Sequence, residues 1–142
     1  MSRFAVAVTA ALVGLGCGTT YTPRATGHVG LVVSHGGAYY VKDGQRTPVG
    51  PLGGDLAALV AASPAAVAEA RAARADLSVG VPCYATGIGG VALGILAFSG
   101  PVGWVVVGAG AAIAGTGLGL MGAGLTHAVD AVNIHNDAVD VR

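Results

Sequence analysis

Charged side chains are scarce in this chain of 142 residues, since Asp, Glu, Lys and Arg together make up 10% of it. Seven basic residues balance seven acidic ones, so the formal net charge is zero, and the basic residues form no cluster along the sequence. Such a chain as a whole has no electrostatic attraction for nucleic acid or for anionic lipid headgroups. We therefore expect no nucleic-acid partner.

The sequence also lacks the residue patterns that are typical of catalytic sites. Two cysteines do not make a disulfide framework. Ser34 and His35 are adjacent, but adjacency in sequence is not a catalytic triad. The glycine-rich runs at 87–90 and 108–124 lack the lysine of a phosphate-binding loop. We expect neither an enzyme nor a bound cofactor.

The shortage of charge is most extreme in residues 77–129, which contain no Asp, Glu, Lys or Arg. Two apolar segments lie inside this stretch, at 79–98 and 102–125, and an uncharged Ser-Gly-Pro turn separates them. About 20 helical residues cover roughly 30 Å, the thickness of the hydrocarbon core of a bilayer. Trp104, next to the turn, suits a membrane interface. The pattern predicts a two-helix transmembrane hairpin over 79–125, although Pro82 leaves the start of the first span open.

Small residues recur at intervals of four within these segments. Gly90 and Gly94 have this spacing in the first segment, and Gly108 lies beside a longer stripe in the second, formed by Gly103, Val107, Ala111, Gly115, Gly119 and Ala123. In lipid, small residues allow helix backbones to approach closely. We expect Gly90, Gly94, Gly108, Gly115 and Gly119 to form a packing face within the hairpin, between copies of the chain, or both. This arrangement resembles bacterial lipoproteins with a glycine-zipper two-helix membrane domain.

The amino terminus has the features of an export signal. Arg3 precedes an apolar run at 4–15, which is too short for an ordinary membrane span, and Gly16-Cys17 follows. Val13-Gly14-Leu15-Gly16-Cys17 resembles the lipobox of bacterial lipoproteins, although Gly14 occupies the place where that motif usually has Leu. The resemblance implies a signal peptide over 1–17 and lipidation of Cys17 with acyl chains such as palmitate. An ordinary cleaved secretory signal and an uncleaved anchor are the alternatives.

Lipidation at Cys17 would determine the side of the membrane on which the protein lies. It implies a lipid-anchored protein of the bacterial cell envelope that faces the periplasm. Gly18 rather than Asp follows the cysteine, and by resemblance to Gram-negative lipoproteins this favours the outer membrane over the inner one.

Between the signal and the hairpin, the sequence predicts a tether at 18–26 and a small α+β module at 27–78. Strands are expected at 28–34, 38–42 and 46–49, with Asp43-Gly44 as a two-residue hairpin turn. Ser63 followed by Pro64 is typical of a helix start, and 65–77 is rich in helix formers. Arg71 and Arg74 on this helix either lie at headgroup level or belong to a solvated face. The fold class is therefore α+β, an antiparallel meander with short helices followed by a glycine-rich helical membrane hairpin.

The polar tail at 126–142 offers two interpretations. The tail has four residues of types that bind metals, namely His127, Asp130, His135 and Asp137, but they lack the close spacing of a metal-binding motif. We therefore predict no metal site. The favoured interpretation is a helix that leaves the membrane. The segment 130–136 is expected to dock back on the module. We expect a structural or interaction lipoprotein that binds membrane lipid and either self-associates or packs on a membrane protein. The alternative is a periplasmic module that binds a small ligand or metal through His28, His35, His127 and His135.

Overall fold

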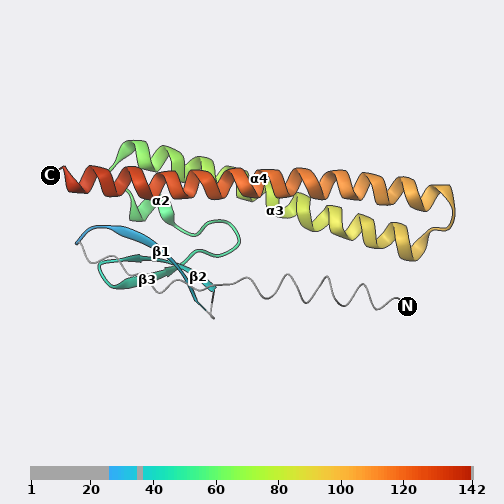
Figure 1. Cartoon of the computed structure of the whole chain (residues 1–142), viewed down its shortest axis with the longest axis horizontal. Coiled ribbons are helices and arrows are strands. Elements are labelled where there is room, and N and C mark those ends of the chain that lie inside the picture. The colour runs from blue at the N-terminus through green and yellow to red at the C-terminus, as the bar shows by residue number, and fades with distance from the viewer. Residues whose placement is uncertain (1–25, 35–36, 142) are drawn as a thin grey trace.

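A three-stranded sheet lies beside one end of a long helical hairpin, and the rest of the hairpin extends beyond the sheet (Figure 1). The computed structural model describes residues 26–34 and 37–141. The signal at 1–17 with Cys17, almost all of the tether, and His35 lie outside the described residues. The α+β class and the carboxy-terminal helical hairpin predicted from the sequence are confirmed.

The sheet is the predicted meander. Strands β1 (Val29–Ser34), β2 (Gly37–Lys42) and β3 (Gln45–Pro48) lie in the order β1-β2-β3, and both pairs are antiparallel. Asp43 and Gly44 connect β2 to β3 with φ values of 50° and 78°, as a type I′ turn requires. A glycine-rich loop and the short helix α2 (Leu56–Leu59) then lead to the hairpin.

The first long helix, α3, covers Pro64–Ala97 and joins two segments that the sequence treated separately. Ser63 caps it as expected, since its hydroxyl accepts a hydrogen bond from the Ala66 amide at 3.4 Å, and Pro64 occupies the first turn. The helix continues through Pro82, so the helix predicted at 65–77 and the span predicted at 79–98 are one element. Proline removes one backbone donor there, but α3 packs along α4 on both sides of this residue.

The second long helix, α4, covers Pro101–Asp140 and includes most of the predicted tail. Phe98, Ser99 and Gly100 form the connection, and Gly100 has a φ of 71°. No break separates the apolar segment at 102–125 from the polar residues that follow it.

The two helices meet along a seam of small residues spaced seven apart. On α3 the seam includes Ala66, Ala73, Gly80, Gly87 and Gly94; on α4 it includes Gly103, Gly110, Gly117, Gly124 and Ala131. A seven-residue repeat keeps the same helix face toward its partner in a left-handed coiled coil. The backbones approach so closely that a Cβ added at Gly87 would overlap the Ala114 backbone, and one added at Gly110 would lie 2.6 Å from the Val91 amide nitrogen.

Among the described residues, large apolar side chains form a core at the end of the hairpin that carries the sheet. Val29, Tyr40, Leu56 and Val60 are buried there against alanines of both helices, namely Ala66, Ala70, Ala73, Ala128 and Ala131. The sheet and α2 therefore cover one half of the hairpin, and no other strand or helix of the described residues covers the other half, which we call the unpartnered half.

We predict that Gly87→Ala destabilises the hairpin by about 1–3 kcal/mol, because the new methyl group would force the two backbones apart. Gly89→Ala is the matched control, since a Cβ at Gly89 meets nothing within 4 Å. Helix propensity should leave that variant unchanged or up to about 1 kcal/mol more stable. Unfolding of the full chain in detergent micelles, followed by far-UV circular dichroism, measures both. Equal stability of the two variants would contradict the seam.

Candidate functional site

The unpartnered half of the hairpin has large apolar side chains on its outside and small residues inside. The buried positions of this half are nearly all glycine or alanine. Side chains that a soluble protein would bury are exposed instead: Ile95 at 65%, Leu96 at 84%, Trp104 at 76% and Val105 at 71%. The interior of this half is therefore complete without them, and they form an apolar outer surface.

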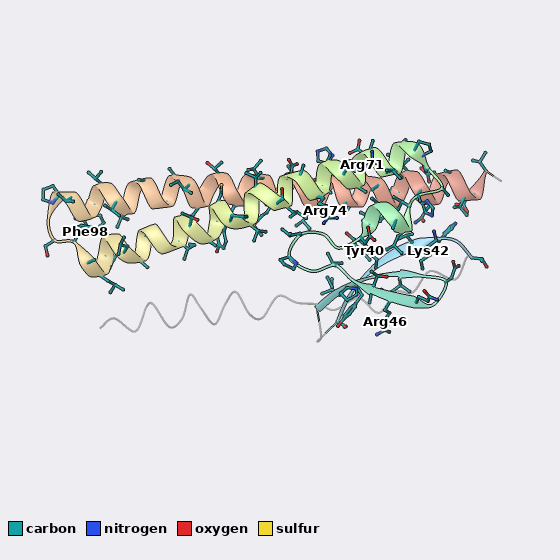
Figure 2. The ribbon with its side chains drawn as sticks, turned by 180° about the vertical axis from the view of Figure 1, so that it is seen from behind. Tyr40, Lys42, Arg46, Arg71, Arg74 and Phe98 are labelled. Carbon is teal, nitrogen blue, oxygen red and sulfur yellow. The ribbon has the colours of Figure 1, made fainter. Side chains whose placement is uncertain are left out.

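Both helices are long and apolar enough to cross a membrane. The relevant segments of α3 and α4 have mean hydropathies of 1.6 and 1.7, and 17% of each segment is buried inside the protein. The uncharged stretch contributes residues 77–97 of α3 and 101–129 of α4, which cover roughly 30 Å and 43 Å, so each is long enough for the hydrocarbon core of a bilayer. Phe98 marks the far end at the turn (Figure 2).

A polar contact joins the two helices where the uncharged stretch meets the sheet-covered half. His127 on α4 donates from Nδ1 to Glu69 Oε2 on α3 at 2.6 Å, and its Nε2 lies 3.8 Å from Asp76 Oδ2. Glu69 and Asp76 are seven residues apart, so they face the same histidine from the same side of α3. Both carboxylates of α3 are thereby directed to one imidazole of α4.

The end of α4 is tied to β1, which confirms that this segment docks on the module. The side-chain amide of Asn136 accepts from the Val29 amide and donates to the Val29 carbonyl, both at 2.9 Å, so it pairs with the edge of β1 as a neighbouring strand would. His135 donates from Nε2 to the Gly27 carbonyl at 3.0 Å, and His28 donates to Asp140 at 2.7 Å. Burial raises the pKa of Tyr40, on the neighbouring strand.

The residues considered for a metal do not come together. His127 contacts α3, whereas His28 and His135 bind different partners near the start of β1. Asp130 and Asp137 are exposed on α4. Within residues 26–34 and 37–141, no three His, Cys, Asp or Glu side chains lie close enough to hold a metal ion. The imidazoles described here serve as structural ties, and His135 keeps Nδ1 buried without a hydrogen-bond partner among the described residues.

The five glycines expected to pack divide into two groups. A Cβ at Gly94 would lie 2.8 Å from the Val107 amide nitrogen, and one at Gly90 would lie 3.3 Å from Gly110 Cα, so both face α4. Gly108, Gly115 and Gly119 have open space beside them, so they take no part in the contact between the two helices. Their role between copies of the chain stays a prediction. The seam itself uses residues that the four-residue pattern missed, and a search for Ala or Gly at intervals of seven would have found them.

We predict that Asn136→Ala loosens the sheet from α4 by about 1–3 kcal/mol, because it leaves the amide and the carbonyl of Val29 without partners. Asn133→Ala, an exposed change one turn earlier on the same helix, is the control. Hydrogen exchange at Val29 should accelerate in the first variant and not in the second. Unchanged exchange in Asn136→Ala would show that this pairing does not hold the sheet.

No protein-family model, curated protein or solved structure matches the chain. The functional argument therefore depends on the hairpin and on its junction with the sheet.

Proposed function

We propose that the chain is a membrane-anchored protein of the bacterial cell envelope. The unpartnered half of its hairpin spans the bilayer, and its sheet lies outside the bilayer. The observation that supports this most directly is the distribution of side chains in that half, with glycine and alanine inside and Ile95, Leu96, Trp104 and Val105 outside. Water disfavours so large a continuous apolar surface, whereas hydrocarbon does not.

A helical hairpin also satisfies the hydrogen-bonding requirement that the bilayer interior places on the backbone. Every backbone polar group there needs a partner within the protein, and α-helices supply it within each segment. The glycine connection at 99–100 would lie at the far interface, where Phe98 and Trp104 have amphipathic or apolar rings suited to that depth. Both ends of the hairpin, and the sheet, would then lie on the same side.

A lipid on Cys17 would be a second anchor on that side. This part of the proposal is supported by the lipobox resemblance of residues 13–17, which lie outside the described residues. Gly18 favours the outer membrane, with the sheet in the periplasm. Intact-mass analysis of the mature protein from membranes tests this anchor directly, because a diacylglyceryl or triacyl group on Cys17 would add its mass to the chain.

The proposed molecular role is structural, through association of hairpins within the membrane. Gly108, Gly115 and Gly119 leave open space on the outside of α4, so the backbone of another helix can approach there. The partner is a second copy of the chain or another membrane protein. No catalytic group is assigned in this proposal.

The single tryptophan of the chain provides a test of insertion. When the full chain is added to preformed vesicles, so that the sheet stays outside, we expect iodide in the external buffer to leave Trp104 fluorescence unquenched. Iodide trapped inside the vesicles should quench it. The control is Val33→Trp in a Trp104→Phe background, which places the probe on exposed β1 and should respond to external iodide. Quenching of Trp104 only from outside would contradict a spanning hairpin.

A second prediction concerns self-association. Gly115→Leu combined with Gly119→Leu should abolish oligomers extracted from membranes, because the new side chains fill the space needed by a second helix. Gly89→Leu, an equally open position on α3, should leave the oligomers intact. Chemical cross-linking in the membrane and sedimentation in detergent measure the result. Normal assembly of the double variant would remove these glycines from the interface.

A further inference from the structure

The fold separates charges that cancel in the sequence as a whole. Glu69 and Asp76 of α3 face His127, whereas Arg71 and Arg74 of the same helix are exposed toward the loop before α2. Among residues 26–34 and 37–141, no side chain forms an ion pair with either guanidinium. A chain with no net charge therefore has two unneutralised arginines on one face of α3.

The two arginines border a groove of about 170 Å³ between α3 and the loop 52–57. Its floor is apolar and consists of Leu56, Ala57, Ala70 and Ala73. Asp55 is the one acidic residue among the groove's described lining residues, so the rim keeps a positive excess. The groove thus combines a cationic rim with an apolar floor.

Two glycines allow the loop before α2 to pack beside Leu77 of α3. Gly53 and Gly54 have φ values of 78° and 64°, and a Cβ at Gly53 would lie 3.1 Å from Leu77 Cδ1. Leu77 is the first residue of the uncharged stretch. Figure 2 shows Arg74 beside the loop, at the point where the hairpin emerges from the covered half. Leu52 at the loop is 40% exposed.

We infer that this groove binds the headgroup of an anionic phospholipid. The inference rests on the proposed insertion of the hairpin, because insertion at Leu77 would bring Arg71 and Arg74 to the level of the lipid phosphates. Guanidinium groups bind phosphate oxygens through paired, charge-assisted hydrogen bonds. The apolar floor suits the glycerol and the first acyl carbons of a lipid, which a free phosphate ion lacks. We therefore assign the site to lipid and not to a soluble anion.

For the test, the full chain is inserted into membranes that contain equal amounts of phosphatidylcholine and phosphatidylglycerol. The chain is then released, and the lipids that stay bound to it are compared. Native mass spectrometry should detect preferential retention of phosphatidylglycerol. Arg71→Gln and Arg74→Gln should each lower this preference about fivefold, the effect of one basic residue near an anionic surface. The double variant should retain the two lipids almost equally. Because both side chains are exposed, the variants should keep the circular dichroism of the parent chain.

Arg46→Gln is the matched control. Arg46 is an exposed arginine on β3, on the side of the sheet away from the helices (Figure 2), and its removal changes the net charge by the same amount. It should leave the lipid preference unchanged. An equal loss in Arg46→Gln would show that overall charge, and not the groove, selects the lipid.

Four further outcomes would overturn the inference. The double variant could retain phosphatidylglycerol as the parent does, or an excess of inorganic phosphate could displace the lipid, which would identify a site for a free anion. A chain whose Trp104 is shielded as expected for insertion, yet which has no lipid preference, would refute the headgroup site alone. Failure of the chain to associate with either lipid would refute the proposed insertion as well.

Discussion

The contact between the backbones of α3 and α4 is the interaction on which the rest of the structure depends. Small residues at intervals of seven allow the two helices to approach until an added methyl group at Gly87 would overlap Ala114. Close packing of this kind supplies many weak dispersion contacts without requiring apolar side chains to be withdrawn from water. The same seam can therefore hold the helices together beneath the sheet and beyond it. It also leaves many large side chains of the unpartnered half exposed, among them Ile95, Leu96, Trp104 and Val105.

The environment around the seam changes along its length, although the seven-residue repeat of small residues does not. At the sheet-covered end, Val29, Tyr40 and Leu56 pack on alanines and form an apolar core. At the other end, glycines replace most of these alanines, and the surroundings must supply the apolar contacts. The contact of His127 with Glu69 lies near the transition between the two environments. It joins the helices by a polar interaction near the last charged residues before the uncharged stretch.

Local features of this fold could be predicted from the sequence, because each depends on a few adjacent residues. The Asp43-Gly44 turn, the Ser63 cap and the limits of the uncharged stretch are of this kind. The relative rotation of two helices depends on a repeat that extends across both, and the four-residue pattern of glycines obscured it. The sequence predicted that 130–136 docks on the module, but the pairing of Asn136 with Val29 joins residues 107 positions apart, and no local pattern identifies that partner. For the candidate surface, composition predicted the apolar hairpin, but the groove that Arg71 and Arg74 form with the loop before α2 required the three-dimensional arrangement.

The unbroken length of α4 has a mechanical consequence. This helix runs for 40 residues from the turn to Asp140, and it contains no proline after its first position. Its last turns are fastened to β1 through Asn136 and to His28 through Asp140. The hairpin and the sheet are consequently connected along α4 without a proline or a break in the helix. A tilt imposed at the turn would swing the sheet through a corresponding arc on the opposite side.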